Sequence, residues 1–268
     1  MRASTSRELK AAVRDYWNTH PCGTEKSSAA KYSRTYYDEL EQRRYEREPE
    51  IFSFAQFTRS YGQRILEVGV GAGADFLQWV RSGAKAHGVD LTPEAIQHTE
   101  RRLEAYGLKA EELRIADCES LPYEENSFDL VYSWGVIHHS PNTEQALREL
   151  VRVCRPGGSC KLMVYNRHSL VAFRLWLKYG LLAGKPWRSL SRVVYHHMES
   201  IGTKAYTRKE VEAMLSPLSV ENVRIEPTIT YYDVKDVTNK LYGLLSGAVA
   251  RIIGDRFGWF LCVQFHKR

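Results

Sequence analysis

The sequence predicts an α/β fold in which a parallel sheet is covered by helices on both faces. From residue 64 onward, short runs of branched apolar residues alternate with segments of helical periodicity. A glycine-rich turn, GVGAG, joins the first apolar run to the first of these helices. With 268 residues and 43% hydrophobic content, the chain is long enough for one well-packed core.

The expected elements follow one another in a regular order. Ahead of the first strand, helices are expected at residues 6–17 and 33–60, the second interrupted at Pro49. The expected strands are 64–68, 85–90, 112–116, 128–133, 159–165, 219–227 and 259–265. The remaining expected helices begin at Ala74 or span 93–107, 143–153, 207–215 and about 235–253.

Two segments break this rhythm. We interpret residues of about 167–206 and 232–257 as helical insertions, because neither continues the alternation of strand and helix. No linker rich in Pro, Gly or Ser divides the chain. The predicted organisation is therefore an N-terminal helical cap, residues 1–62, followed by one domain, residues 63–268, that carries both insertions.

Charge, cysteine content and apolar segments disfavour several classes of protein. The net charge is +6, but the basic residues are scattered, which favours a solvated surface over nucleic-acid binding. The five cysteines form no CxxC pair, so we expect reduced thiols, no metal site and a cytoplasmic protein. The amino terminus has no apolar core of a signal peptide, and no apolar run is long enough to span a membrane.

The turn after the first expected strand predicts a nucleotide site. Gly69, Gly71 and Gly73, with Val70 among them, satisfy both the dinucleotide pattern GxGxxG/A and the looser pattern of S-adenosylmethionine sites. Glycines permit the tight turn and let the backbone approach a ligand at the start of a helix. This pattern alone does not choose between the two ligands.

An acidic residue within the first strand favours S-adenosylmethionine. Glu67 lies in an otherwise apolar run, where an unpaired charge would cost several kcal/mol. Its carboxylate would repel a dinucleotide pyrophosphate, whereas it would hold the cationic amino-acid end of S-adenosylmethionine. The alternative is a strand-end glutamate that accepts a hydrogen bond from a nearby backbone N–H.

Two further acidic residues end the next two strands. Asp90, followed by Leu91, lies where a carboxylate accepts hydrogen bonds from a ribose diol, although Thr92 competes as a helix cap. Asp117 can accept from an adenine amino group while the backbone of Cys118 meets the ring. Helix capping is the alternative role for both aspartates.

Four segments resemble the class I S-adenosylmethionine-dependent methyltransferases, in particular the subgroup of ubiquinone, menaquinone and natural-product enzymes. They are LEVGVGAGADF, GVDLTPEAI, ADCESLPYEENSFDLVYSWGVIHH and LRELVRVCRPGGS, and they fall within residues 64–164. The resemblance implies a Rossmann-like, mostly parallel sheet of seven strands whose last strand is antiparallel, S-adenosylmethionine as cofactor, and S-adenosylhomocysteine as product. It also implies cofactor contacts from Gly69, Gly71, Asp90, Asp117, Glu119, Ser133 and Trp134.

Relatives carry a lid helix ahead of the first strand, and residues 33–48 resemble it. Tyr37 and Arg44 are seven residues apart and therefore share a helix face, from which they could reach the cofactor carboxylate. The alternative for Arg44 is a salt bridge to Glu41 or Glu48 on a solvated helix.

The segment WGVIHHSP places two histidines after the fourth strand, at the sheet edge where ligands of α/β proteins bind. Relatives with a similar turn are thought to use a histidine as general base. We expect His138 to face the acceptor and His139 to turn away, although the turn could reverse this. The alternative is that either ring only bonds the backbone near Pro141 and holds the loop.

The first insertion contains an unusually apolar helix, residues 169–187, with Arg174 and Lys178 as its narrow polar stripe. Water cannot surround such a helix, so it closes over the site, forms a dimer contact, or lies on a membrane surface. The expected acceptor-binding residues are Tyr165, Asn166, Trp176, His196, His197 and Tyr206.

The predicted function is transfer of a methyl group to an oxygen or nitrogen atom. The acceptor is a small molecule with an aromatic or carboxylate group, or a peptide, and a homodimer is one option for the assembly. The alternatives are a nicotinamide-dependent oxidoreductase, for which Glu67 and Asp117 are poorly suited, and a cofactor-binding regulatory protein without catalysis. The sequence does not identify the acceptor.

Overall fold

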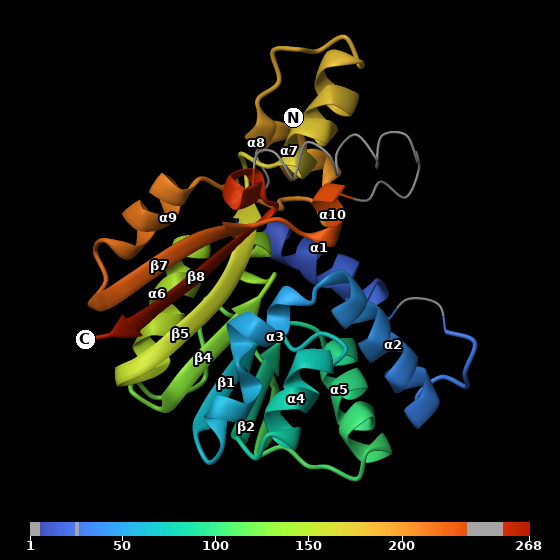
Figure 1. The fold of residues 1–268 in the computed structure, drawn as a ribbon, viewed down its shortest axis with the longest axis vertical. Coiled ribbons are helices and arrows are strands. Elements are labelled where there is room, and N and C mark those ends of the chain that lie inside the picture. Colours follow the sequence, from blue (N-terminus) through green and yellow to red (C-terminus); the bar gives the residue numbers. More distant parts are fainter. Residues whose placement is uncertain (1–5, 25–26, 235–253) are drawn as a thin grey trace.

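The computed structural model describes residues 6–24, 27–234 and 254–268. Its strands form one sheet in the order β3-β2-β1-β4-β5-β8-β7, with β6 paired to β5 off this path (Figure 1). The strands are β1 Arg64–Val68, β2 Lys85–Asp90, β3 Glu112–Ile115, β4 Phe128–Trp134, β5 Cys154–Asn166, β6 Ala205–Tyr206, β7 Val220–Thr228 and β8 Phe260–Lys267. The predicted α/β class with a mostly parallel sheet is confirmed.

The carboxyl-terminal strand is antiparallel, as expected. β8 pairs antiparallel with β5 on one side and with β7 on the other, whereas β1 to β5 are mutually parallel. The sheet has one strand more than the sequence predicts, because Ala205 and Tyr206 form a two-residue pairing with β5. A strand of two residues is too short to show periodicity, so no sequence pattern predicts it.

Helices cover both faces of the sheet. They are α1 Ser6–Thr19, α2 Arg34–Arg47, α3 Glu50–Ala55, α4 Ala74–Arg81, α5 Pro93–Ala105, α6 Thr143–Val153, α7 Leu170–Trp176, α8 Leu190–His197, α9 Arg208–Leu215 and α10 Tyr231–Val234. Short helical turns are η1 Phe57–Ser60, η2 Ile137–His139, η3 Leu177–Leu181 and η4 Gly254–Phe257. In the part of the chain that is described, no helix is both long and apolar enough to cross a membrane.

The core lies in two layers, one on each side of the sheet. Alternate residues of β4 supply them: Leu130 and Tyr132 pack with α4 and α5 on one face, whereas Val131 packs with α6 on the other. The parallel strands are therefore buried on both faces, which fixes their register and brings their carboxyl ends to one edge.

Two expected helices differ from the sequence-based prediction. The helix expected over residues 33–60 is divided into α2, α3 and η1, because Pro49 begins a new helix and Gln56 adopts a left-handed backbone, φ 59°. The helix expected over residues 169–187 ends at Leu181 after a π-helical turn, and a loop then leads to α8. The helix expected near residues 235–253 lies outside the described residues.

A glycine between η4 and β8 allows two backbone segments to come close together. A Cβ atom on Gly258 would lie 2.1 Å from both the carbonyl carbon and the carbonyl oxygen of Thr228. We expect Gly258→Ala to lower the free energy of unfolding by about 2 to 4 kcal/mol, because the paired strands β7 and β8 resist separation.

Urea unfolding followed by circular dichroism measures this loss. Gly62→Ala is the matched control: Gly62 has a φ of 71° but no atom within 4 Å of its added Cβ, so only backbone strain of about 1 kcal/mol is introduced. Equal losses for the two variants would contradict the close contact at Gly258.

Candidate functional site

A large cavity of about 980 Å³ opens at the carboxyl ends of the parallel strands. The turn after β1, Asp90 at the end of β2, Asp117 after β3 and the turn after β4 all border it. Residues of α1, α2 and α7 close its other sides. This edge is where open α/β sheets bind their ligands, and the volume is at the upper end of the range for small-molecule sites.

The glycine-rich turn forms the floor of the cavity. Gly69 has a φ of 85°, and a Cβ atom there would lie 2.2 Å from a methyl carbon of Val136. Gly69, Val70 and Gly71 border the cavity. Gly73 does not: its close neighbour is Thr99, so this glycine serves the packing of α4 against α5.

Glu67 is a buried carboxylate at the cavity wall. It is 3% exposed, and its Oε2 atom has no hydrogen-bond partner among the described residues. Burial, together with the nearby charge of Asp75, raises the pKa of Glu67 well above its ordinary value. A cation that entered the cavity would favour the ionised form, so this wall is suited to a positively charged ligand group.

The carboxylate of Asp90 fixes the loop that follows β2. Its Oδ1 accepts hydrogen bonds from both the backbone N–H and the hydroxyl of Thr92, each 2.9 Å, and its Oδ2 accepts from the N–H of Gly71 at 3.1 Å. Thr92 itself caps α5. A carboxylate can accept about four hydrogen bonds, so Oδ2 retains capacity for a ligand hydroxyl. Leu91 also borders the cavity.

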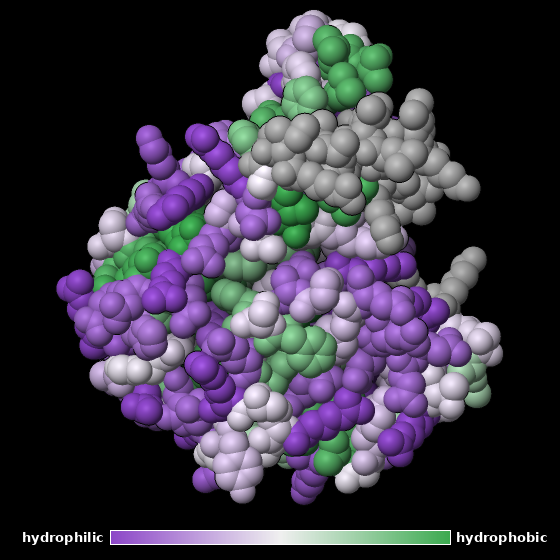
Figure 2. All heavy atoms as spheres, viewed as in Figure 1, coloured by the Kyte–Doolittle hydropathy of each residue, from purple (hydrophilic) through white to green (hydrophobic). Residues whose placement is uncertain are grey.

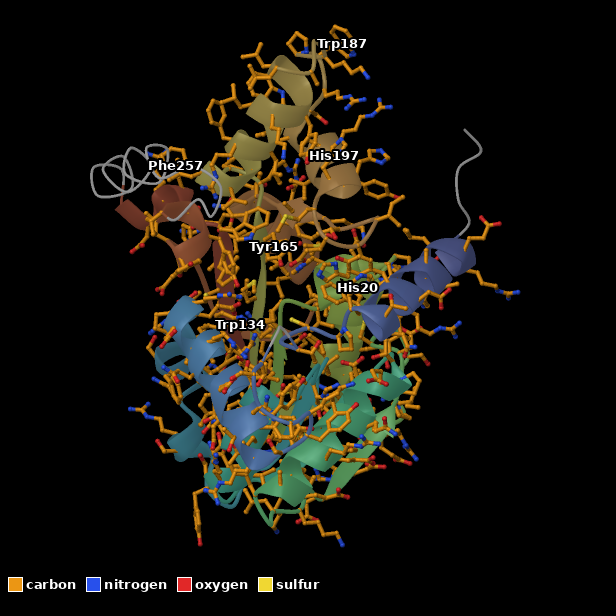
Figure 3. The ribbon with its side chains drawn as sticks, turned by 90° about the vertical axis from the view of Figure 1, so that its right-hand side faces the viewer. His20, Trp134, Tyr165, Trp187, His197 and Phe257 are labelled. Carbon is orange, nitrogen blue, oxygen red and sulfur yellow. The ribbon has the colours of Figure 1, made fainter. Side chains whose placement is uncertain are left out.

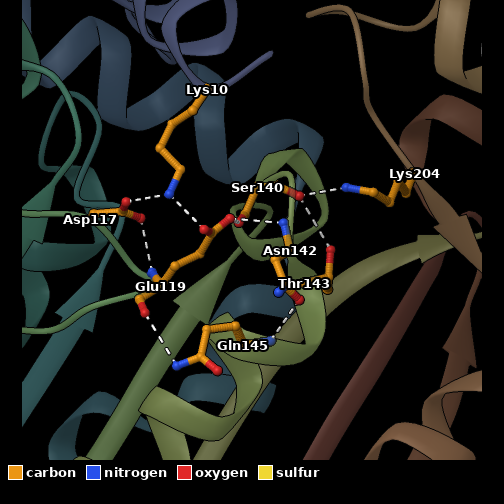
Figure 4. Close-up of polar contacts among 8 residues, drawn as sticks. All are labelled: Lys10, Asp117, Glu119, Ser140, Asn142, Thr143, Gln145 and Lys204. Atoms are coloured by element: carbon orange, nitrogen blue, oxygen red, sulfur yellow. Dashed lines mark hydrogen bonds and ion pairs between the residues drawn. The ribbon is translucent and has the colours of Figure 1, made fainter. Parts of the chain in front are cut away.

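The first helix covers the edge of the cavity beside Asp117. The ammonium of Lys10 lies 2.5 Å from Asp117 Oδ2 and 2.5 Å from Glu119 Oε2 (Figure 4). Asp117, Cys118 and Lys10 border the cavity. Glu119 does not; its side chain accepts from the hydroxyl of Ser140 and ties the end of β3 to the turn after β4. Sequence reasoning missed Lys10, because nothing in its helix marks one lysine.

The second helix contributes one of its two predicted residues. Arg44 borders the cavity and forms two hydrogen bonds, 2.9 and 2.8 Å, with the carboxylate of Asp75, while Glu48 lies 3.8 Å away. Tyr37 is fully buried and donates to the carbonyl of His98, so it does not reach the cavity. In this structure α2 turns the Tyr37 side chain toward α5 instead of toward the cavity.

The orientations of the two histidines of η2 are the reverse of those expected from the sequence. His139 borders the cavity, whereas His138 is 0% exposed and neither of its ring nitrogens has a hydrogen-bond partner among the described residues. The ring of His138 packs 4.0 Å from that of Tyr165. Desolvation lowers the pKa of His138 well below its ordinary value and that of His139 to about 3.

A carboxylate that sequence reasoning missed completes this wall. Glu199 Oε2 accepts from the hydroxyl of Tyr165 at 2.9 Å and lies 3.5 Å from Nε2 of His139. On the far side of the imidazole, Nδ1 lies 3.0 Å from the hydroxyl of Thr203, which itself donates to the carbonyl of Ser200. The hydroxyl of Ser200 also lies 3.1 Å from Nδ1, so both hydroxyls hold this side of the ring while Nε2 faces Glu199.

The environment of Glu199 makes it a titratable group near neutral pH. The Glu199 side chain is 34% exposed at the cavity wall, and desolvation by the surrounding wall raises its pKa to about 7, opposed by the hydrogen bond from Tyr165 and reinforced by the charge of Glu48. Glu199 lies in a loop 60 residues from His139 and belongs to no motif, so only the fold brings them together.

Aromatic side chains line the rest of this wall. Figure 3 shows Trp134 and Tyr165 between the main body and the projecting hairpin of α7 and α8. Trp134 donates from Nε1 to Glu48 at 2.7 Å, and Tyr165 stacks on Trp259 at 4.2 Å. Both predicted residues border the cavity.

Several predicted residues lie away from the cavity. Ser133 is a fully buried residue of β4, and Asn166 binds the backbone of Gly258 and His168. Trp176 donates to the carbonyl of Arg188 within the hairpin. The remaining three, which do not border the cavity, are His196, His197 and Tyr206. The two histidines are exposed at the end of α8.

The apolar insertion nevertheless contributes a cavity wall. Val171, Leu175 and Leu177 border the cavity together with the two residues of the predicted polar stripe, Arg174 and Lys178. Arg174 is half-buried at the cavity wall, whereas Lys178 is exposed at the cavity edge and part of the apolar surface faces solvent. Among the residues that the structure describes, no group of three His, Cys, Asp or Glu side chains is arranged to hold a metal ion.

A comparison with protein families matches residues 66–162 to a methyltransferase domain. Demethylmenaquinone methyltransferase of Bacillus mycoides is 28% identical over 55% of this chain and 64% of its own length. Malonyl-[acyl-carrier protein] O-methyltransferase of Halorhodospira halophila is 31% identical over 54% of this chain and 49% of its own length. The chain matches about a third of the length of an uncharacterised protein of Mycobacterium tuberculosis, 38% identical over 37% of this chain.

Solved structures share the fold over nearly the whole chain. Magnesium protoporphyrin IX methyltransferase from Synechocystis, with bound S-adenosylhomocysteine, superposes with a TM-score of 0.60 over 97% of this chain and all of that one, at 11% identity. A phosphoethanolamine N-methyltransferase of Haemonchus contortus gives 0.59 over 95% of this chain and 60% of that one, at 19% identity.

The buried state of His138 predicts a pH-dependent loss of stability. Its folded pKa is depressed, so below the unfolded value near 6.5 the unfolded chain binds more protons and stability falls as the pH falls. Between pH 6.5 and pH 5, we expect the free energy of unfolding of His138→Phe to fall by about 1.5 to 2 kcal/mol less than that of the wild type.

Urea unfolding of both proteins at several pH values measures the difference. His20→Phe, a substitution of an exposed histidine, is the control and should leave the slope unchanged. A wild-type slope in His138→Phe would show that the ring is protonated in the folded protein.

Proposed function

We propose that this chain, whose residues 66–162 form a methyltransferase domain of class I fold, transfers a methyl group from S-adenosylmethionine to an oxygen or nitrogen atom of a small acceptor. The observation that supports this proposal is one continuous cavity. It joins the acidic edge of Glu67, Asp90 and Asp117 to the wall of Tyr165 and His139. A cationic cofactor and an acceptor would therefore meet in the same enclosed space.

The residues at the acidic edge fit S-adenosylmethionine. The unpartnered Oε2 of Glu67 suits the ammonium of the amino-acid end, and the spare acceptor capacity of Asp90 suits a ribose hydroxyl. Asp117 would accept from the adenine amino group beside Cys118. A dinucleotide would bring its pyrophosphate toward the buried Glu67, which disfavours the nicotinamide alternative. The bound cofactor supplies an electrophilic methyl group.

The opposite wall favours an acceptor with a flat or apolar part. Trp134, Tyr165 and Phe260 present aromatic surface to the cavity, and Met163 and Leu175 add aliphatic surface. These side chains would orient the acceptor and exclude water, which is the main contribution that a protein makes to an in-line displacement.

A proton must leave the acceptor when its nucleophile is a phenol, hydroxyl or ammonium. We assign this step to the pair of His139 and Glu199. The pKa of His139, about 3, is too low for a general base at neutral pH. The pKa of Glu199, about 7, is close to neutral pH and therefore suits a general base. His139 Nε2 would position the acceptor or relay its proton, and Glu199 would retain it. A carboxylate acceptor needs no base.

The proposal is tested by calorimetric titration with S-adenosylmethionine, S-adenosylhomocysteine and NADH, followed by turnover with phenols, catechols, quinols, amines and carboxylic acids. Binding of the first two ligands with turnover of at least one acceptor is expected. Tight binding of NADH without binding of S-adenosylmethionine would overturn the proposal.

The position of Glu67 predicts discrimination between ligands. Glu67→Gln should weaken S-adenosylmethionine binding by about 1 to 3 kcal/mol and leave adenosine binding nearly unchanged, because adenosine lacks the amino-acid end. Wild-type affinity for S-adenosylmethionine should also rise with pH, since binding the cation releases a proton from a carboxyl whose pKa is raised.

Asp90→Asn is the matched comparison and should weaken both ligands, because both carry the ribose. Calorimetry in buffers of different ionisation enthalpy measures affinity and proton release together. Equal losses for the two ligands in Glu67→Gln would remove Glu67 from the amino-acid end.

The role of Glu199 predicts a change in the pH profile. With a phenolic or amine acceptor, wild-type kcat should rise with pH around an apparent pKa of about 7. Glu199→Gln should lower kcat by roughly 100-fold and abolish this limb, with cofactor affinity retained. Steady-state rates against pH measure both effects. Wild-type turnover in Glu199→Gln would exclude Glu199 as the base. The control is His138→Phe, which changes a residue outside the cavity.

A further inference from the structure

The loop at the end of the α7–α8 hairpin carries an exposed apolar surface. Every residue from 181 to 187, LLAGKPW, is exposed, and only Lys185 among them is charged. Leu182 is 76% and Trp187 is 77% exposed. Trp187 lies at the far end of the hairpin in Figure 3, and Figure 2 shows hydrophobic atoms on the same projection. Clustered apolar exposure of this kind marks an interaction surface.

The hairpin holds this surface through its own contacts. Trp176 Nε1 donates to the carbonyl of Arg188 at 2.8 Å, and Arg188 donates to the carbonyl of Tyr179 at 3.2 Å. The ring of Tyr179 stacks on that of His197 at 4.0 Å. The exposed tryptophan and leucine therefore lie on a hairpin that has hydrogen bonds and a ring stack of its own.

The charges around the loop all have one sign. Residues 167–198 contain six basic residues and no Asp or Glu; the basic residues are Arg167, Arg174, Lys178, Lys185, Arg188 and Arg192. Lys178, Lys185 and Arg192 are exposed, and none of these three forms an ion pair within the described residues. The surface is complementary to one that is apolar inside and negatively charged at its boundary.

We propose that this hairpin tip, residues 181–187 with the flanking Lys178, Arg188 and Arg192, docks onto a membrane surface that contains anionic phospholipid. Tryptophan and leucine side chains enter the boundary between headgroups and acyl chains, while lysine and arginine remain at the level of the phosphates. A basic residue near such a surface contributes about fivefold in affinity, so the apolar and basic groups act together.

The tip also lies at the edge of the cavity. Leu182 and Lys178 belong to the exposed tip and border the cavity as well. A docked tip would therefore bring the edge of the cavity to the lipid surface. The docking itself does not depend on methyl transfer, so the two proposals can fail separately.

Sedimentation with vesicles tests the proposal on the full chain. We expect binding to phosphatidylcholine vesicles with about 30% phosphatidylserine, weak binding to pure phosphatidylcholine, and weaker binding as salt is raised above about 0.1 M. Trp187→Ser should lower the affinity by at least about tenfold, and Lys185→Glu combined with Arg192→Glu should do so by more than tenfold.

Matched controls lie elsewhere on the surface. Tyr61→Ser removes a side chain that is 79% exposed outside the hairpin, and Lys209→Glu changes an exposed charge on α9. Both should bind vesicles as the wild type does. Soluble glycerophosphoserine should not compete, which distinguishes a bilayer surface from a free headgroup. Thermal melting checks that each variant is folded.

Three results would overturn the proposal. The first is no binding to anionic vesicles by the folded wild-type chain. The second is binding that the hairpin variants leave unchanged. The third is a concentration-dependent dimer, seen by analytical ultracentrifugation and abolished by Trp187→Ser, which would assign the surface to a second copy of the chain.

Discussion

The candidate site is organised around a carboxylate that the fold buries without a protein partner for one of its oxygens. Glu67 lies in the otherwise apolar strand β1, where the loss of hydration and the charge of Asp75 raise its pKa although the charge of Arg44 opposes this shift. Burial of such a group is unfavourable unless a ligand completes its interactions. The turn at Gly69 and the ion pair of Arg44 with Asp75 lie around the same cavity, so the carboxyl end of β1 is open to it.

Three elements outside the parallel sheet convert this open edge into an enclosed site. The helix α1 is tied to the sheet through Lys10 and the carboxylates of Asp117 and Glu119, and α2 is tied through Arg44. The hairpin of α7 and α8 supplies the third wall.

The far wall shows how burial changes the chemical roles of side chains. His139 is the residue whose ordinary pKa suits proton transfer at neutral pH, yet desolvation lowers that pKa to about 3. The same environment raises the pKa of Glu199 to about 7. The titrating group of this wall is thus a carboxylate, and the imidazole is held by Thr203 in one orientation.

The sequence by itself determined what is local: the strand and helix order from residue 64, the glycine turn after β1, and the acids at the ends of β1, β2 and β3. Periodicity and spacing fix these features, because parallel strands of a doubly covered sheet place their carboxyl ends at one edge. Only the tertiary structure decided that Tyr37 turns inward, that His139 rather than His138 borders the cavity, and that Glu199 joins it. These depend on side-chain directions in irregular turns and on contacts between segments far apart in the chain, which no short-range pattern encodes.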